Sequence, residues 1–299
     1  MSVGFLRSIR RLLSVLFVIE RRSPKVVDFV CPKCGGVLNI SDNNVKKCGQ
    51  NHCYDRSRRG YYNLLLGTGG IHGDNSEMVD ARRRFLSYGH YDRLRRAICD
   101  TVLGVMPENG VLLDAGAGEG YYTSFVENAL YERDNFSNVL AFDISKDAVA
   151  KLSSLNKRIS SSVASSYKMP LSDQCCDVVM NVFSPLALSE TLRVIKPGGH
   201  YIMVFPDEMH LFGLKAKLYD EPYKNRPEDT SIQGLCVISD VSLEYDIFLS
   251  TSDEINSLFM MTPYAYRTPP EKRRLLNELD SLKTQVAFRI VLYKKAERN

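Results

Sequence analysis

The stretch that decides the expected fold is Val111-Leu112-Leu113-Asp114-Ala115-Gly116-Ala117-Gly118-Glu119-Gly120. An apolar run closes on an acidic residue and then opens into alternating glycines, which predicts a buried strand, a tight turn and the start of a helix. The glycines would let the backbone turn sharply and approach a ligand closely, because no Cβ obstructs it. The stretch therefore predicts a nucleotide-like ligand site.

The spacing of the glycines separates two kinds of ligand. The dinucleotide fingerprint is Gly-x-Gly-x-x-Gly, with the pyrophosphate at a helix N-terminus. Here the third glycine comes one residue earlier, and Asp114 stands two residues before the first. This arrangement resembles the cofactor loop of class I S-adenosylmethionine (SAM) methyltransferases, in which the loop holds the amino-acid part of the cofactor. A nicotinamide or flavin enzyme and a loop that binds nothing are the alternatives.

Strands and helices alternate from Leu94 onward, which predicts an α/β, Rossmann-like domain built on a parallel sheet with helices on both faces. The expected helices span 94–104, 120–130, 146–156 and 186–195, and the expected strands span 111–114, 139–143, 159–164, 177–182 and 200–205. After Pro206 the pattern is less regular, with helices near 208–219, 253–260 and 271–283 and strands near 244–249 and 286–293. Ahead of this domain, a basic helix is expected from Glu77 to Tyr91, with a turn at Gly89-His90.

Four residues near the N-terminus could together bind a metal ion. Cys31-x2-Cys34 is followed, after thirteen residues, by Cys48-x3-His52, which is the pair-then-pair spacing of a structural zinc site. Three thiolates and an imidazole would fill the tetrahedron, so the metal would stabilise a small module and not catalyse. Cys53 adjoins His52 and is an alternative fourth ligand. A reduced cysteine-rich loop without metal is the alternative to the site as a whole.

The remaining cysteines do not form the pattern of a disulfide framework, so a reducing, cytoplasmic location is expected. Residues 1–22 imitate a signal peptide, with arginines ahead of an apolar run from Leu12 to Ile19. That run is shorter than the ~20 residues that span a bilayer, and no small-residue cleavage site follows it. We expect a loosely ordered extension over 1–27, with neither export nor membrane insertion.

Charge is unevenly distributed along the chain. The sequence holds 39 Lys and Arg against 35 Asp and Glu, for a net charge of +4, but residues 1–60 hold twelve basic residues against four acidic ones. A basic end favours contact with a polyanion, because neutralised phosphates release counterions. A merely solvated basic tail is the alternative.

Two strand ends carry further information about ligands. Asp143 ends the strand expected at 139–143, where an acidic residue suits ribose hydroxyls; an N-cap for the next helix is the alternative, although Ser145 would serve equally well. The strand expected at 177–182 ends in Phe183-Ser184-Pro185. The Asn/Asp-Pro-Pro-Tyr signature that grips exocyclic amines is absent there, which disfavours methylation of adenine N6 or cytosine N4.

Several motifs in combination resemble the bacterial 23S ribosomal RNA (guanine-N1)-methyltransferases. They are the Cys/Cys/Cys/His module, Gly60-Tyr61-Tyr62-Asn63-Leu64-Leu65, Ala81-Arg82-Arg83-Arg84-Phe85-Leu86, Gly89-His90-Tyr91, Gly118-Glu119-Gly120-Tyr121-Tyr122-Thr123 and Met261-Thr262-Pro263. The resemblance covers roughly residues 28–293 and implies methylation of N1 of a guanine in a hairpin loop of 23S rRNA, with SAM as donor. The extension and Asp207-Glu208 depart from the family pattern.

The resemblance also implies roles for particular residues. Zinc would be bound by Cys31, Cys34, Cys48 and His52. The SAM site would be lined by Tyr91, Gly118, Glu119 and His210. Asp114, Gly116 and Asp143 are already favoured as SAM-site residues by their positions at the ends of the expected strands. Spacing alone does not single out Tyr91 or His210, which would read as a core aromatic and a surface histidine. No residue identifies itself as a general base.

The expected organisation is an extension over 1–27, a zinc module over 28–66, a linker with a basic bridging helix over 67–93 and a methyltransferase domain over 94–299. We expect the zinc module and Arg82–Arg84 to hold the RNA hairpin, and a homodimer is a further possibility. Two other functions stay open: a methyltransferase of a small molecule or a protein, and a catalytically inactive RNA-binding protein with the same fold.

Overall fold

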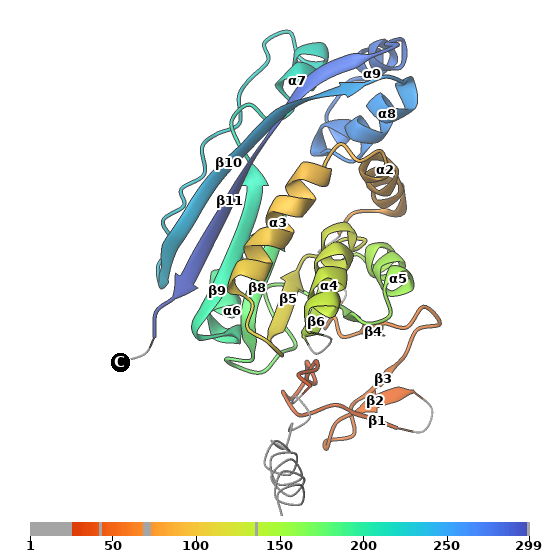
Figure 1. Cartoon of the computed structure of the whole chain (residues 1–299). Coiled ribbons are helices and arrows are strands. Elements are labelled where there is room, and N and C mark those ends of the chain that lie inside the picture. Colours follow the sequence, from red (N-terminus) through yellow and green to blue (C-terminus); the bar gives the residue numbers. More distant parts are fainter. Residues whose placement is uncertain (1–25, 42–43, 68–72, 135–136, 298–299) are drawn as a thin grey trace, which may run out of the picture.

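The structure is a computed structural model that describes residues 26–41, 44–67, 73–134 and 137–297. Within these residues, eight strands form one sheet in the order β10-β11-β9-β8-β5-β6-β7-β4 (Figure 1). These strands are β4 (Tyr62–Asn63), β5 (Val111–Ala115), β6 (Asn138–Asp143), β7 (Ser160–Val163), β8 (Cys176–Val182), β9 (Ile195–Pro206), β10 (Leu235–Leu249) and β11 (Leu282–Lys295). Three short strands form a second sheet: β1 (Asn39–Ile40), β2 (Val45–Lys47) and β3 (Cys53–Asp55).

The helices lie mainly between these strands, as the alternation predicts. They are α2 (Ser76–Ser87), α3 (Asp92–Val105), α4 (Tyr121–Asp134), α5 (Lys146–Leu155), α6 (Leu188–Val194), α7 (Phe212–Leu218), α8 (Ser252–Met260) and α9 (Pro270–Asn277), with a 3-10 helix η1 (Pro263–Tyr266). The expected extension lies outside the described residues except for Val26 and Val27, and residues 68–72 of the expected linker lie outside them too. None of the helices in the described ranges has the length and apolar character to cross a membrane.

The α/β class is confirmed, but the sheet is not parallel throughout. It is parallel from β9 through β8, β5, β6 and β7 to β4. The parallel sheet expected for the strands up to residue 205 is therefore confirmed, whereas β11, from the less regular region after Pro206, runs antiparallel to both β9 and β10. A strand's residue pattern is the same in either direction, and only its position between β9 and β10 decides the direction of β11. β10 also begins at Leu235, well before the expected 244.

Apolar side chains divide between the two faces of the sheet, because successive residues of a strand point to opposite sides. In β5, Leu112 belongs to one hydrophobic cluster and Leu113 to the other. Helices α3 and α4 cover the first face. The second face is covered by α6 and by the N-terminal module, which contributes Phe29, Cys31, Leu38 and Cys48 to the cluster. The cysteine-rich module thus replaces part of the helical layer that was expected on this face.

The module is joined to the sheet by backbone hydrogen bonds as well as by this cluster. β4 pairs in parallel with β7, with Tyr62 opposite Ser162, and the Val30 N–H donates to the Pro170 carbonyl at 2.8 Å. In Figure 1 the module lies at one end of the molecule, and α7, α8 and α9 lie at the other. The expected boundaries of the separate parts stay a prediction.

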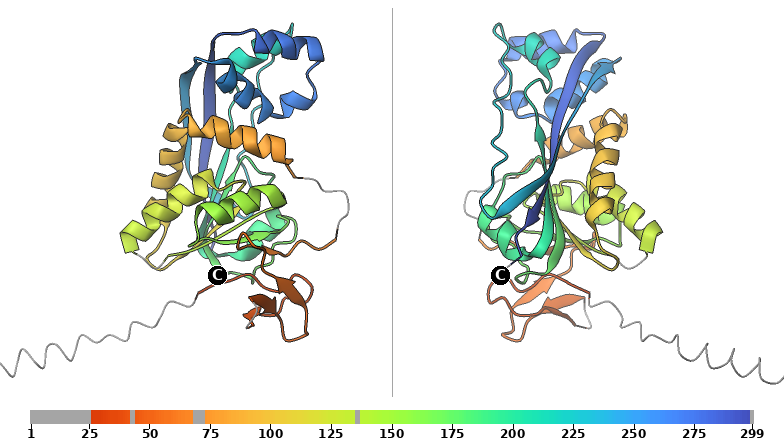
Figure 2. Two further views of the ribbon diagram at one scale, coloured as in Figure 1. Left: turned by 90° about the vertical axis from the view of Figure 1, so that its right-hand side faces the viewer. Right: turned by 60° about the vertical axis from the view of Figure 1, so that its left-hand side comes forward.

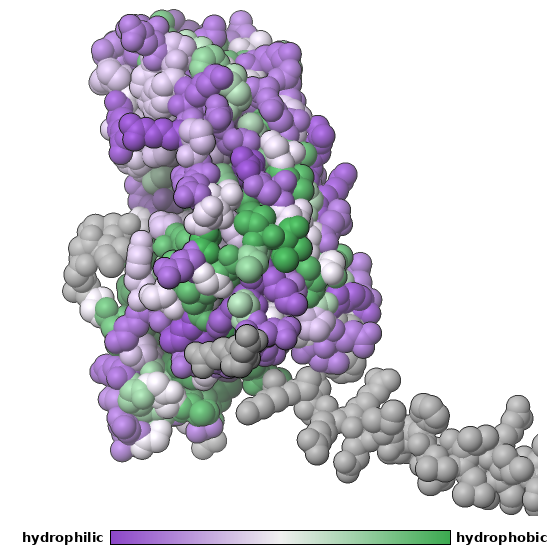
Figure 3. All heavy atoms as spheres, turned by 90° about the vertical axis from the view of Figure 1, so that its left-hand side faces the viewer, coloured by the Kyte–Doolittle hydropathy of each residue, from purple (hydrophilic) through white to green (hydrophobic). Residues whose placement is uncertain are grey.

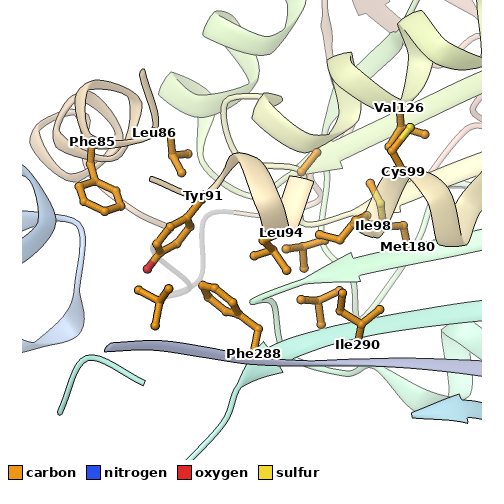
Figure 4. Packing of buried hydrophobic residues seen from close by; sticks show 14 of the residues in the cluster. Phe85, Leu86, Tyr91, Leu94, Ile98, Cys99, Val126, Met180, Phe288 and Ile290 are labelled. Atoms are coloured by element: carbon orange, nitrogen blue, oxygen red, sulfur yellow. The ribbon is translucent and has the colours of Figure 1, made fainter. Parts of the chain in front are cut away.

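The helix expected over Glu77–Tyr91 ends at Ser87, just ahead of the turn expected at Gly89-His90. Gly89 adopts φ +80°, a left-handed conformation that ends a helix, and α3 begins after Tyr91. Figure 2 shows α2 and α3 meeting at a steep angle. The break places Tyr91 at the junction, 3% exposed, with its ring centroid 5.0 Å from that of Phe288 (Figure 4).

Helix α3 packs on the sheet through a continuous apolar stripe. Figure 4 shows Leu94 and Ile98 directed toward Phe288 and Ile290 of β11. Leu94, Ile98 and Phe288 are 0% exposed. Burial of such side chains stabilises by roughly 1.5–3 kcal/mol each. This packing fixes the start of α3, and with it Tyr91, against the sheet.

Candidate cofactor site and metal centre

A cavity of about 1160 Å³ opens at the carboxyl ends of β5, β6, β8 and β9. Its lining combines the glycine loop, the turns after β6 and β8, part of α2 and residues 261–264. Ligands of α/β proteins bind at the carboxyl edge of the parallel strands. Small-molecule sites usually measure roughly 300–1,000 Å³, so this cavity has room for a cofactor and part of a second ligand.

The glycine loop after β5 tolerates no side chains at its tightest points. Gly116, Gly118 and Gly120 have φ of +92°, +56° and +87°. A Cβ on Gly116 would lie 2.3 Å from Ser184 Oγ, and a Cβ on Gly120 would lie 2.3 Å from Leu152 Cδ1. The expected tight turn is therefore present, and it is enforced both by backbone conformation and by close neighbours.

Two buried carboxylates at this loop keep oxygens without hydrogen-bond partners. Asp114 accepts a hydrogen bond from the Thr123 hydroxyl at 2.5 Å through Oδ2, whereas its Oδ1 has no partner. Glu119 is 5% exposed, and neither of its oxygens is hydrogen bonded. Burial raises the pKa of Asp114 to about 7 and also raises that of Glu119. Unpaired buried carboxylate oxygens cost stability, so they fit a ligand that brings ammonium or hydroxyl donors.

Asp143 connects the glycine loop to the turn after β6. Its Oδ2 accepts from the Gly118 N–H at 2.9 Å, and its Oδ1 accepts from the Ser145 N–H at 2.7 Å. Ser145, not Asp143, is the N-cap of α5. Each carboxylate oxygen keeps a further lone pair, so Asp143 can still accept from a ribose hydroxyl.

Arg82 enters the cavity from α2. It pairs with Asp74, and its Nη1 lies 3.6 Å from Glu119 Oε2. The carboxylates Asp74, Glu119 and Asp143 all act on its guanidinium and raise its pKa against the effect of burial. Arg82 was expected to contact RNA, which stays a prediction; the structure places it beside the glycine loop.

Tyr91 and His210 meet inside the cavity wall. Tyr91 Oη lies 3.4 Å from His210 Nε2, and the Ala287 N–H donates to His210 Nδ1 at 3.3 Å. Burial lowers the pKa of His210 to about 3. A neutral imidazole that accepts at Nδ1 carries its proton on Nε2 and donates it to Tyr91, so the tyrosine hydroxyl hydrogen is free to donate to a ligand. His210 is therefore a positioning group and not a base.

The expected metal ligands form one cluster. Ligand atoms of Cys31, Cys34, Cys48 and His52 all lie within 4.8 Å of one another. The Cys31 and Cys48 sulfurs are each 3.4 Å from His52 Nδ1, and the Cys34 and Cys48 sulfurs are 3.6 Å apart. A tetrahedral zinc ion with usual bond lengths separates its ligands by about 3.6–3.8 Å. The four side chains fit such an ion.

Neighbouring groups support this cluster and exclude the alternative ligand. The Tyr54 hydroxyl lies 3.2 Å from Cys31 Sγ. Burial raises the pKa of the Cys31 thiol, but hydrogen bonds from Tyr54 and from backbone groups of Cys34 and Lys33 outweigh burial and bring it to about 6. Cys53 is exposed, and its thiol donates a hydrogen bond to the Asn51 carbonyl at 3.4 Å, outside the cluster.

Comparison with known proteins assigns the family. Residues 29–66 match the model described as RlmA, N-terminal, a zinc ribbon, and residues 113–203 match a methyltransferase domain. A protein of Micromonospora griseorubida with the provisional name 23S rRNA (guanine-N1)-methyltransferase is 30% identical over 263 residues, which make up 81% of this chain and 88% of that protein. The chain belongs to the 23S rRNA (guanine-N1)-methyltransferase family.

Two further members of the family are similar to this chain, one over a shorter part of it than the Micromonospora protein and one over a longer part. The 23S rRNA (guanine(748)-N(1))-methyltransferase of Streptomyces fradiae is 32% identical over 184 residues, which are 60% of this chain and 64% of that protein. YxjB of Bacillus subtilis, which also carries a provisional name of this family, is 29% identical over 278 residues, or 88% of this chain and 96% of that protein. The family's methyltransferase domain and zinc ribbon make this chain a SAM-dependent methyltransferase with a bound structural zinc ion.

All seven residues expected at the cofactor of this family member line the cavity: Tyr91, Asp114, Gly116, Gly118, Glu119, Asp143 and His210. Reasoning from the sequence missed Arg82 as a cavity residue and Tyr54 as a neighbour of the metal cluster. No local signal marks either one, because Arg82 reads as one of three arginines on a solvated helix and Tyr54 as a residue of a short strand.

The basic residues of this family member are only partly free to contact RNA. Lys46 is 4% exposed and pairs with Asp28 at 2.5 Å, and Arg84 pairs with Asp253 at 3.1 Å. Lys47, Arg58 and Arg59 of the zinc ribbon are exposed. The ribbon thus keeps a smaller set of free cations than its sequence suggests.

Proposed function

We propose that this protein methylates N1 of a guanine in a hairpin loop of 23S rRNA. Family membership supports both the methyl transfer and 23S rRNA as the substrate, because the relatives that this chain matches are named for this reaction. The observation that carries the proposal is the single cavity, which joins the carboxylates of the glycine loop to an aromatic wall beside β8. A cofactor and a base can meet there.

We further propose the residues that hold the two groups. Zinc is bound by Cys31, Cys34, Cys48 and His52. SAM contacts Tyr91, Asp114, Gly116, Gly118, Glu119, Asp143 and His210. When bound, SAM supplies a methyl group activated by its sulfonium. The oxygens of Asp114 and Glu119 that lack hydrogen bonds would accept from donors of the cofactor. Asp143 would accept from a ribose hydroxyl, and the Tyr91 hydroxyl would donate to an acceptor of the cofactor.

The protein's own contribution to the reaction is position and exclusion of water. Reactants held in line within a closed site need little further assistance from acids or bases. N1 of guanine lies on the Watson–Crick edge, so the base must be unpaired or flipped out of its stack to enter the cavity. A hairpin loop presents such a base. The N1 proton must also leave, and His210 cannot take it because it stays neutral with Nδ1 occupied.

Methyl transfer is tested on the RNA itself. Purified protein with labelled SAM should modify 23S rRNA from a deletion strain and not from the wild type, where the site is already methylated. A methyl at N1 blocks Watson–Crick pairing, so primer extension should stop at one guanine. Label that appears in protein or small molecules instead, or no label in RNA, would contradict the proposal.

RNA contact by the zinc ribbon is a separate part of the proposal. Charge reversal at the exposed Lys47, Arg58 and Arg59 should weaken RNA binding and lower the salt slope by about 1 for each lost phosphate contact. Arg274→Glu on α9, at the opposite end of the molecule, is the matched control (Figure 1). An unchanged affinity and slope in the triple variant would remove the ribbon from the interface.

We also propose a homodimer through β10, the edge strand of the large sheet. Residues 236–242 of β10 are all exposed, among them Val237, Ile238 and Val241 at 47%, 55% and 50%. Apolar side chains gather near the middle of the corresponding face in Figure 3. Exposed apolar edge strands pair with other strands. Light scattering should show a dimer that Ile238→Lys converts to a monomer; a monomeric wild type would refute this.

A cytoplasmic location is the last part of the proposal, since ribosomal RNA is there. None of the eight cysteines forms a disulfide, as a reducing compartment would require. Fractionation of cells that express a tagged full chain would test the location.

A further inference from the structure

Phe183 stands out among the described residues by its backbone. Six non-glycine residues have positive φ: Asn44, Asn51, Asn109, Gln174, Phe183 and Leu211. Three of these are Asn, which tolerates such turns; the two apolar ones, Phe183 and Leu211, both line the cavity. A bulky side chain at φ +56° is strained, and such strain gathers at functional sites.

The strain at Phe183 turns its ring toward the cavity. The residue directly follows β8, and its N–H donates to the Val204 carbonyl at 2.9 Å, which holds the backbone in place. The next residue, Ser184, lies over Gly116 of the cofactor loop. Phe183 thus lines the cavity one residue ahead of the serine that lies over the cofactor loop.

The surroundings of the ring leave part of it free. Its edges pack against Tyr122 and Phe288, with centroid distances of 6.3 Å and 5.7 Å and interplanar angles of 66° and 48°. Phe288 is 0% exposed, but Phe183 is 42% exposed. An aromatic ring supported from behind and open in front presents a flat apolar surface to the cavity.

From these observations we infer that Phe183 is the stacking platform that positions the target guanine for attack by N1. The inference rests on the proposed function and deepens it. A flipped base loses the two neighbouring bases that stacked on its faces. An aromatic side chain can take the place of one of these neighbours. Stacking on a ring fixed next to the glycine loop would hold the Watson–Crick edge toward the cofactor.

The experiment compares Phe183→Leu with Phe183→Tyr in the full-length protein. Loss of one base–aromatic stack costs roughly fivefold to a hundredfold, so Phe183→Leu should lower kcat/KM for the RNA by that factor. Phe183→Tyr keeps the ring and should restore most of the rate. Calorimetry should show SAM affinity within about twofold of wild type in both variants, because none of the contacts proposed for SAM comes from Phe183.

A fluorescence measurement separates stacking from a general structural role. The RNA probe is a hairpin with 2-aminopurine at the mapped target position. Wild type and Phe183→Tyr should quench the fluorescence of this base, and Phe183→Leu should quench it less. Tyr131→Leu on α4 is the control, since Tyr131 is 46% exposed and lies outside the cavity lining. It should leave rate and quenching unchanged.

Each outcome decides a different statement. If wild type methylates RNA and Phe183→Leu keeps its full kcat/KM and quenching, the stacking platform is refuted and the proposed function stands. If Phe183→Leu binds SAM much more weakly, the ring belongs to the cofactor wall and the inference is overturned. If wild type transfers no methyl to RNA, the proposed function and the inference fall together.

Discussion

The hydroxyl of Tyr91 lies 3.4 Å from Nε2 of His210, although 119 positions separate the two residues. The Ala287 N–H occupies the other ring nitrogen, so the histidine has one tautomer and the tyrosine has one free hydrogen. Tyr91 stands at the junction of α2 and α3, and His210 stands just ahead of α7. The contact therefore ties two distant segments of the cavity wall together.

His210 should make stability fall in mild acid. The unfolded imidazole binds a proton near pH 6.5, whereas the folded one does so only near pH 3. Lowering the pH through this window favours the unfolded state, so the stability is fully present above pH 6.5 and is lost toward pH 3. The loss is on the order of 1 kcal/mol per pH unit. Urea unfolding of wild type and His210→Gln without SAM, from neutral pH to mild acid, should give a steeper slope for wild type. Parallel curves would show that the imidazole is not buried in its neutral form.

Gly116→Ala should abolish tight SAM binding. The new methyl would lie 2.3 Å from Ser184 Oγ at a φ of +92°, so the loop must shift. We expect a loss of at least about tenfold in SAM affinity by calorimetry and a destabilisation of roughly 1–3 kcal/mol. Gly104→Ala is the matched control, since Gly104 lies inside α3 with no atom within 4 Å of the added Cβ. It should be neutral or stabilise by about 0.5–1 kcal/mol. Equal SAM affinity in the two variants would contradict the close approach at Gly116.

Glu119→Gln should separate binding from stability. The carboxylate is buried without a hydrogen bond, and burial raises its pKa, so the charge does not stabilise the free protein. We expect the Tm without ligand to stay unchanged or rise, while SAM affinity falls about tenfold or more. A lower Tm with unchanged SAM affinity would mean that the contact with Arg82 is what Glu119 provides.

Removal of zinc should unfold the N-terminal ribbon and weaken the sheet beneath it. Cys31 and Cys48 belong to the same hydrophobic cluster as Leu113 and Val179, so loss of the metal would expose one face of the large sheet. Cys48→Ser should contain no zinc by elemental analysis and should have a lower Tm than wild type. Cys53→Ser, which removes an exposed thiol outside the cluster, should keep the zinc content and the Tm of wild type. Loss of zinc in Cys53→Ser would mean that the fourth ligand is Cys53.

Local patterns predicted much of the fold. The strand and turn at 111–120 and the helix over 146–156 follow from apolar spacing and capping by Ser145, and they appear as β5, the glycine loop and α5. The metal cluster was visible for the same reason, since a tetrahedral ion needs ligands at short, regular intervals of chain. Differences arise where a distant partner decides. The direction of β11 depends on β9, and the burial of Tyr91 depends on Phe288 of β11.

The sequence by itself determined the cofactor loop and the four-residue metal cluster, because both depend on spacing within a few dozen residues. The tertiary structure alone decided that Arg82 turns into the cavity, that His210 is neutral beside Tyr91, and that Phe183 lines the same cavity as Gly116. These relationships join segments far apart in the chain. Burial, hydrogen-bond partners and strain belong to the folded arrangement, and no pattern along the chain encodes them.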